Sequence, residues 1–356
     1  TDKFSVDSKL LERLMKDNLA EDPRVSVIMP VYNDEAFVGE ALNYVLAQTE
    51  SNFEIIVCDD ASTDDSALIV GQLASTDRRV KTLRNHVNRG VCFTRDRAIS
   101  VARGQWIALL DGDDCYHPQR LQKMLQFAEM QDADMVADGF LLIDENGKRS
   151  GEEFVPCKQA GKKVNVRAYV ENGMPSGRRF NFGYLKPMIR RDFVARHALS
   201  YHPDAWCGQD FVFYFECLLH DADFRLMKGS YYYYRKYPRP RTVESKIKRT
   251  RRHQENNRFM LQRAKTRPDL VILLKKRDRF FNYSVRYENL MTAVKAMNLA
   301  GVLQGWKGGR EYWGFCLRML ARRLINRVKS RLRAFSPSHR WSDVGTTQDL
   351  HARLPF

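Results

Sequence analysis

The stretch QWIALLDGDD, residues 105–114, runs from an apolar segment into three carboxylates arranged around one glycine. The apolar part has the composition of a strand that is buried on both faces. Alternate residues of an extended segment point the same way, so Asp111 and Asp113 are predicted to present two carboxylates to one ligand. Gly112 between them lets the backbone approach that ligand closely. The structural alternative is an acidic turn that caps a helix starting at Pro118.

This carboxylate spacing favours a hard divalent cation. Mg²⁺ and Mn²⁺ prefer oxygen ligands and commonly bridge to substrate phosphates. We therefore expect a site for Mn²⁺ or Mg²⁺ together with a diphosphate. An EF-hand does not fit, because Cys115 occupies a position that a calcium ligand would need. Asp114 falls outside the i, i+2 pair and is expected to cap the helix or to support the ligands from behind.

Strand-like and helix-like segments alternate from residue 25 onward. The apolar, strand-like runs are VSVIMPVY (25–32), FEIIVCDD (53–60), RVKTLRN (79–85), QWIALLDGDD and ADMVADGFLLID (133–144). The segments between the first four carry apolar residues at helical spacing, the first of them behind a cap at Asn33 or Asp34. Strands joined by helical crossovers predict an α/β fold, a mainly parallel sheet with helices on both faces. Residues 145–164 are expected to form a loop.

In such a sheet, ligands bind at the carboxyl ends of the strands. Asp59 and Asp60 end one predicted strand, while Asp111 and Asp113 end another, so the acidic residues are expected to meet at one edge. Asp60 has a structural alternative, because Asp is an ordinary capping residue at a strand-to-helix turn. Arg95 has one too, as a solvated side chain.

Four segments in this order and spacing closely resemble the family 2 inverting glycosyltransferases of GT-A fold, and are similar to bacterial exopolysaccharide glycosyltransferases. They are VSVIMPVYND, EIIVCDDASTDDS, NRGVCFTRDRAIS and GQWIALLDGDDCYHPQRL. The resemblance covers residues 24–235. It implies a Rossmann-like GT-A domain that binds a nucleotide-sugar donor.

The resemblance also assigns residues to the donor site. The expected donor nucleotide-binding residues are Pro30, Tyr32, Asp60, Arg95 and Asp111. Of these, Pro30, Tyr32 and Asp60 match residues that contact the base. Asp111 and Asp113 match the D-x-D motif that binds the ribose or diphosphate and its metal, with Asp113 the stronger metal ligand.

The resemblance implies a single displacement in which an acceptor hydroxyl attacks the anomeric carbon, and this requires a general base. The family commonly has a Glu-Asp pair at the start of a helix, and WCGQDFVFYFECL (206–218) matches it with Gln209 in place of the Glu. Asp210 is therefore the expected base, with Asp204 in reserve. The structural alternative for Asp210 is a carboxylate favoured by the helix dipole.

The expected activity is metal-dependent, inverting transfer of a hexose, glucose from UDP-glucose, to a glycan or lipid-linked oligosaccharide acceptor. The expected process is bacterial exopolysaccharide or cell-surface polysaccharide synthesis. Two alternatives stay open within this reading, a lipid or protein acceptor and a scaffold without activity.

Charge divides the 356-residue chain unevenly around its net charge of +16. Residues 1–227 contain 28 Lys and Arg against 35 Asp and Glu, while residues 228–340 contain 30 against 6. The Pro- and Arg-rich segment YYYYRKYPRPRT (231–242) breaks the pattern of the first part. We therefore predict an N-terminal helical extension over 1–23, a catalytic domain over 24–240 and a basic helical region over 241–356.

The segment 310–335 is predicted to form a basic amphipathic helix. Its apolar residues recur every three or four positions: Trp313, Leu317, Leu320, Leu324, Val328, Leu332 and Phe335. Such a helix fits the surface of an anionic membrane, and packing against the catalytic domain is the alternative. Nucleic-acid binding is a rival reading of the basic charge, but carboxylates at the sheet edge would repel nucleic-acid phosphates.

The seven cysteines show no CxxC pairing, which favours reduced thiols in the cytoplasm. The first residues lack the apolar region of a signal peptide. No apolar run approaches the ~20 residues that span a bilayer. The expected location is therefore cytoplasmic, peripheral on the inner face of the cell membrane.

Overall fold

The computed structural model describes residues 22–156, 160–175, 180–205, 207–236, 243–298, 302–303, 305 and 309–335. The chain forms two compact units. The first contains Thr1–Arg239 and Phe259–Leu273, and the second contains Pro240–Arg258 and Leu274–Phe356. Residues 1–21 of the predicted N-terminal extension lie outside the described residues.

The described residues of the first unit form a ten-stranded sheet. Eight of its strands follow the order β3-β2-β1-β4-β9-β6-β10-β5, while β7 pairs with β6 and β8 pairs with β10. The strands are β1 (Val25–Val31), β2 (Phe53–Asp59), β3 (Val80–Arg84), β4 (Trp106–Leu109), β5 (Cys115–Tyr116), β6 (Met135–Ile143), β7 (Arg149–Phe154), β8 (Lys162–Val164), β9 (Met188–Arg190) and β10 (Phe224–Arg235). The prediction of an α/β fold with a mainly parallel sheet is confirmed.

The central strands run parallel, and their apolar residues are covered on both faces. Every residue of β1, β2 and β4 is buried. Strand β1 pairs in parallel with both β2 and β4, and β2 pairs in parallel with β3. Strand β9 is the exception at the centre, since it runs antiparallel between β4 and β6.

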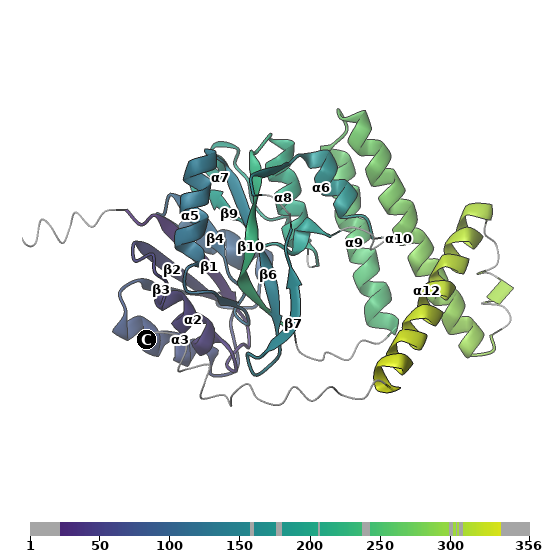
Figure 1. The fold of residues 1–356 in the computed structure, drawn as a ribbon, viewed down its shortest axis with the longest axis horizontal. Coiled ribbons are helices and arrows are strands. Elements are labelled where there is room, and N and C mark those ends of the chain that lie inside the picture. The colour runs from purple at the N-terminus through teal and green to yellow at the C-terminus, as the bar shows by residue number, and fades with distance from the viewer. Residues whose placement is uncertain are drawn as a thin grey trace, which may run out of the picture. The chain divides into compact units, whose positions relative to one another are not determined.

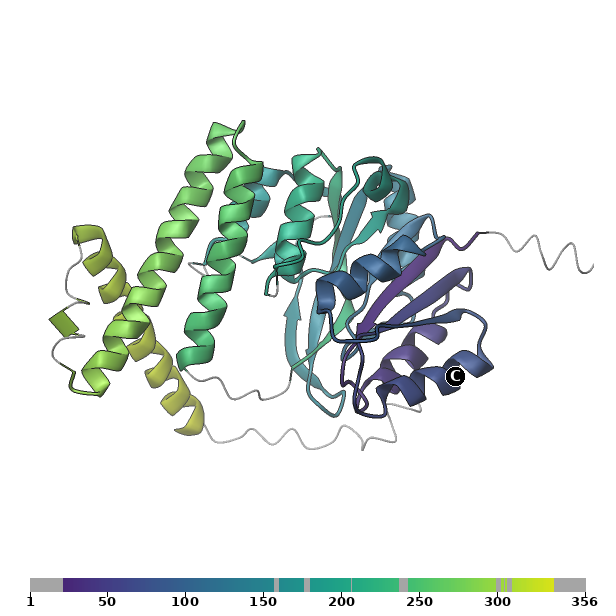
Figure 2. The same cartoon turned by 180° about the vertical axis from the view of Figure 1, so that it is seen from behind.

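Helices cover the two faces of this sheet (Figures 1 and 2). They are α2 (Val38–Leu46), α3 (Ser66–Thr76), α4 (Val91–Ser100), α5 (Arg120–Gln131), α6 (Val166–Asn172), α7 (Arg191–Arg196) and α8 (Gln209–Leu219). Helices α2, α3 and α5 lie on one face, and α4 and α8 lie on the other.

The starts of two helices differ from prediction. Helix α2 starts after Phe37, which makes no side-chain cap, so the expected cap at Asn33 or Asp34 is wrong. The Oδ1 atom of Asn33 instead accepts a hydrogen bond from the backbone of Thr63. Helix α5 starts at Arg120 rather than Pro118.

Two further differences concern strands. Residues 145–164 are not simply a loop, because they contain β7 and β8. The sheet also continues through the tyrosines at 231–234, which belong to β10. Strand β10 is irregular: its register against β6 shifts between Leu226 and Tyr232, and Gly229 has φ of 104°.

The second unit is helical, as predicted for the C-terminal region. It contains most of α9 (Val243–Arg263), most of α10 (Pro268–Lys295), and α12 (Arg310–Phe335). Helices α9 and α10 are joined by polar contacts, including a 2.8 Å hydrogen bond from Gln254 to Asn282. Helices α10 and α12 share a buried cluster made of Tyr287, Tyr312, Phe315 and Cys316.

The predicted helix over 310–335 forms, and part of its predicted apolar stripe is exposed. Leu317 is 66% exposed and Leu320 is 39% exposed, while Trp313 packs partly against the buried cluster. The side chains of Leu324, Val328, Leu332 and Phe335 lie outside the described ones. Within the part of the chain that is described, no helix is both long and apolar enough to cross a membrane.

Candidate active site

The acidic residues meet at one edge of the sheet because their strands are parallel. Val31 at the end of β1 is aligned with Asp59 at the end of β2, and the backbone N–H of Asp60 donates to the carbonyl of Val31. Asp111 follows β4, the other parallel neighbour of β1. The predicted convergence at the carboxyl ends of the strands is confirmed.

Asp60 is buried at the floor of this edge and holds the segment that leads into α4. Its carboxylate accepts hydrogen bonds from the side chain of Asn85 at 2.7 Å and from the backbone N–H groups of Arg89 and Gly90 at 2.8 Å. Tyr32, by contrast, is 46% exposed at the end of β1, and Pro30 is buried within it. All three predicted base-contacting residues therefore lie at this edge.

Four charged side chains form a closed square beside it. Arg95 from α4 pairs with Asp210 at 2.5 Å and also with Asp111. Lys186 pairs with the same two carboxylates, with Asp111 at 2.7 Å and with Asp210 at 2.8 Å. Arg95, Lys186 and Asp210 are buried, and Asp111 is partly exposed. The structure thus brings Asp111 and Asp210 together through two shared cations.

This arrangement decides the protonation state of Asp111. Burial alone would raise the pKa of the Asp111 carboxyl, but Lys186 and Arg95 hold that pKa far below its ordinary value. The pKa values of Lys186 and Arg95 are raised in turn, because the two carboxylates outweigh the effect of burial. Asp111, Lys186 and Arg95 are therefore charged at neutral pH.

Asp210 has a further partner in Tyr201, whose hydroxyl lies 3.3 Å from Oδ1 of the carboxylate. Asp210 stands in the first turn of α8. The reserve candidate Asp204 is exposed, and its backbone N–H donates to His202. Of the two candidates for the general base, only Asp210 belongs to the square.

Asp114 supports the acidic turn from behind. One of its carboxylate oxygens accepts from the hydroxyl of Tyr232 at 2.6 Å, and the other accepts from the backbone N–H of Arg235 at 2.7 Å. Burial and the neighbouring Asp113 and Asp111 raise the pKa of this carboxyl well above its ordinary value. Its expected supporting role agrees with these contacts, whereas helix capping does not.

Asp34 is a site residue that the sequence did not reveal. A Cβ atom at position 112 would lie 2.7 Å from Oδ2 of Asp34, so Gly112 is what allows the two segments to approach. Burial, then Asp113 and Asp111, raise the pKa of Asp34 to about 6. Carboxylates that repel one another in this way form a donor set that suits a hard divalent cation.

The acidic turn therefore fits the expected Mn²⁺ or Mg²⁺ in the chemistry of its oxygen atoms. Asp113 lies partly exposed at the turn, and its carbonyl accepts from Nε of Arg235. Among the described residues, no three His, Cys, Asp or Glu side chains already stand as a complete metal-binding group.

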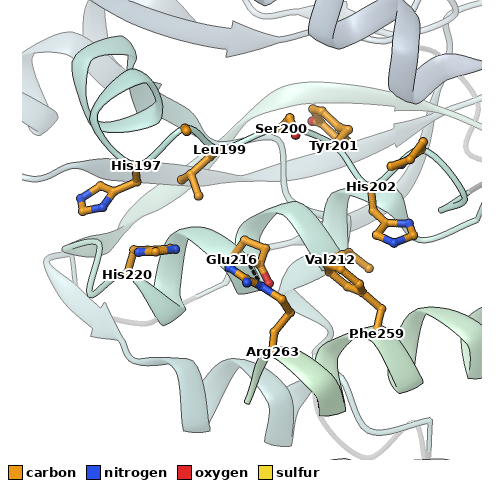
Figure 3. Close-up of a pocket in the computed structure, with 12 residues that line it drawn as sticks. His197, Leu199, Ser200, Tyr201, His202, Val212, Glu216, His220, Phe259 and Arg263 are labelled. Atoms are coloured by element: carbon orange, nitrogen blue, oxygen red, sulfur yellow. Dashed lines mark hydrogen bonds and ion pairs between the residues drawn. The ribbon is translucent and has the colours of Figure 1, made fainter. Parts of the chain in front are cut away.

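A separate pocket of about 300 Å³ lies along α8 (Figure 3). Glu216 and Arg263 meet within it at 2.9 Å, His197 and His220 lie near one end, and Phe259 lies near the other. Tyr201 also lines the pocket, so one residue connects it with Asp210. No sequence motif indicated this pocket.

Residues 26–190 match the family model described as glycosyl transferase family 2. Residues 26–190 belong to glycosyl transferase family 2. This assignment confirms the resemblance carried by the four sequence segments, and the matched range includes Asp60, Arg95 and the D-x-D motif but ends before Asp210.

Curated relatives of this chain include a succinoglycan biosynthesis protein and a putative glycosyltransferase. The succinoglycan biosynthesis protein ExoO of Rhizobium meliloti is 31% identical over 53% of this chain and 54% of its own length. The putative glycosyltransferase EpsE of Bacillus subtilis is 39% identical over 38% of this chain and 49% of its own. The chain thus spans about half the length of these relatives.

Solved structures show the same fold at low identity. The mannosyltransferase PcManGT from Pyrobaculum calidifontis, in complex with GDP-Man and Mn²⁺, has a TM-score of 0.55 and 16% identity, over 85% of this chain and 81% of its own. S. aureus TarS 1–349 in complex with UDP-GlcNAc has a TM-score of 0.52 and 17% identity, over 78% and 89%.

Proposed function

We propose that this chain is a metal-dependent, inverting glycosyltransferase that moves a hexose, glucose from UDP-glucose, onto a glycan or lipid-linked oligosaccharide. The proposed process is bacterial exopolysaccharide or cell-surface polysaccharide synthesis. One observation supports the activity: Asp210 and Asp111 share the same two buried cations, so the proposed proton acceptor lies close to a residue of the proposed donor site.

Asp210 is the proposed general base. The acceptor hydroxyl gives its proton to the Asp210 carboxylate while its oxygen attacks the anomeric carbon. The bond between that carbon and the donor diphosphate breaks, and the sugar is transferred with inverted configuration. Tyr201 and Arg95 hold the carboxylate in place through the contacts described above.

The donor occupies the edge formed by β1, β2 and β4 in this proposal. Asp60, Tyr32 and Pro30 face the base, and Arg95 with Asp111 lies near the ribose and diphosphate. Asp113 and Asp111 would hold a divalent cation, which would supply positive charge for the leaving diphosphate. The proposal of a nucleoside diphosphate donor is supported by the UDP-GlcNAc and GDP-Man complexes of structurally similar proteins.

The anionic inner face of the cell membrane is the proposed location, with α12 as the contact. Leu317, Leu320 and Ile325 are exposed apolar residues of this helix, and the exposed Arg318 accompanies them. Exposed apolar side chains beside basic ones suit the headgroup region of anionic lipids.

Nucleotide sugars with and without Mn²⁺ test the activity. We expect UDP-glucose to raise the melting temperature most when Mn²⁺ is present, and Asp113→Ala to remove the metal-dependent part of that shift. A larger rise in melting temperature with UDP-GlcNAc or GDP-Man would identify that nucleotide sugar as the donor in place of UDP-glucose. The absence of any shift with all three, in either condition, would contradict the proposed function.

A further inference from the structure

Lys186 reaches the active site because β9 runs antiparallel to its neighbours β4 and β6. Parallel strands deliver the residues that follow them to the carboxyl edge, as Asp111 follows β4. An antiparallel strand delivers the residues that precede it. Met188 of β9 is aligned with Ala108 of β4, so the chain just before β9 lies beside the chain just after β4. This register places Lys186 next to the D-x-D turn.

The backbone of Lys186 is fixed by a buried scaffold. Its carbonyl accepts a 2.6 Å hydrogen bond from Arg120, which pairs with Asp138 at 2.8 Å. Arg120 and Asp138 are almost completely buried, and the Arg120 guanidinium lies 4.3 Å from the ring centroid of Tyr116. Lys186 is therefore held in position from below, unlike a lysine on an open surface.

The ammonium group of Lys186 has unused capacity. An ammonium group carries three N–H donors. Within the described residues, Nζ has two acceptors, Asp111 Oδ2 and Asp210 Oδ2. The third donor is available to an anion that enters beside Asp111, and Lys186 is only 6% exposed, so such a contact would be shielded from water.

The charge balance of the square indicates what an incoming anion would change at the site. Arg95 and Lys186 neutralise Asp111 and Asp210, so the square carries no net charge. A carboxylate that accepts hydrogen bonds from two cations is a weak base. If one cation turns toward an incoming anion, the carboxylate it leaves becomes a better proton acceptor.

We propose that Lys186 binds the phosphates of the nucleoside diphosphate donor and, by turning from Asp210 to the donor, prepares Asp210 to accept a proton. Lys186 is then both a donor-binding residue and a positioning residue for the base. This inference rests on the proposed function, and it adds an order: Asp210 becomes an effective base only after the donor has bound.

Binding of UDP and of uridine to Lys186→Met separates a phosphate contact from a structural role. We expect the affinity for UDP to fall about tenfold or more, as for the loss of a charged hydrogen bond, and the affinity for uridine to stay unchanged. Lys186→Arg, which keeps the charge, should restore UDP binding to within a few-fold. Lys163→Met is the matched control, since Lys163 is exposed and pairs with Asp223 elsewhere.

The pH dependence of kcat/KM for the donor tests the positioning role, because it reports the free enzyme, in which Lys186 still contacts Asp210. Removing this cation should move the acidic limb of the kcat/KM profile to higher pH in Lys186→Met, whereas a merely structural role would lower kcat/KM without moving that limb.

A wild-type measurement covers the case in which Lys186→Met does not fold. Saturating UDP should protect Lys186 from an amine-acylating reagent in a mass-spectrometric assay, with Lys163 as the internal reference. Equal labelling with and without UDP would overturn the inference, as would equal UDP affinity in Lys186→Met and wild type. Either result leaves the proposed function standing if wild type binds UDP, whereas wild type that binds no nucleoside diphosphate contradicts the function itself.

Discussion

Arg95 donates a hydrogen bond to Asp210 over 2.5 Å, and both side chains are buried. The two residues come from different helices, α4 and α8, on the same face of the sheet. This pair connects the donor half of the domain, which the family model covers, with the half that carries the proposed base.

Asp210→Asn should lower transfer about 10²- to 10⁴-fold, because the amide cannot take the acceptor proton. Affinity for UDP should stay equal or rise, since Arg95 and Lys186 then lose one of their two carboxylates. Turnover and UDP titration measure the two effects. Asp204→Asn serves as the control and should turn over normally. Normal turnover in Asp210→Asn together with a loss of turnover in Asp204→Asn would identify Asp204 as the base.

Asp60→Ala should destabilise the first unit by about 2–4 kcal/mol, because three donors lose their acceptor in a buried place. Urea unfolding measures this change. The matched control is Asp65→Ala at the start of α3, where the side chain makes no cap hydrogen bond. Equal unfolding free energies for both variants would show that the Asp60 contacts contribute nothing to stability.

Asp96 makes stability depend on pH. Its carboxylate accepts from the backbone N–H of Tyr201, and burial raises its pKa to about 6. The folded state therefore holds this proton more tightly than the unfolded state. The resulting stability is complete below about pH 4, the usual range for Asp, and is lost as pH rises through about 6.

Asp96→Asn should remove this dependence. Between pH 4 and 7, wild type should lose up to about 2 kcal/mol of unfolding free energy relative to the variant. Denaturant unfolding at a series of pH values measures the difference. Parallel curves for the two proteins would rule out Asp96 as the titrating group.

Leu317→Asp with Leu320→Asp should weaken binding to vesicles that contain anionic lipid, because both changes put a negative charge on the exposed face of α12. Vesicle flotation measures this. Leu68→Asp provides the control, because Leu68 is also an exposed apolar residue but lies on α3. Undiminished flotation of the double variant would remove α12 as the membrane contact.

Local sequence patterns predicted the parallel part of the fold well. Strands β1, β2 and β4 are continuous apolar runs, and the residues that follow such strands must share an edge, so the placement of Asp60 and Asp111 followed directly. Lys186 could not be found in this way. Its place depends on β9, a three-residue strand whose antiparallel direction is set by long-range pairing with β4 and β6.

Contacts across the fold account for other site residues that the sequence did not reveal. Tyr232 lies in a run of tyrosines that looked like a domain boundary, and nothing local links it to Asp114. Asp34 was predicted to be a helix cap from its local sequence alone. Its approach to Gly112 could not be predicted in this way, because it exists only after β1 and β4 have paired. The proposed roles of Asp210 and Asp113 stay predictions.

The irregular segment of β10 has a consequence for insertions and deletions. From Leu226 to Tyr232 the strand uses three residues more than β6 uses from Ala137 to Phe140. An odd number of extra residues reverses the faces to which later side chains point. Removing one residue here would exchange the faces of Tyr232 and Tyr233 and withdraw the hydroxyl that holds Asp114. We therefore expect this segment to tolerate the insertion or deletion of two residues better than that of one.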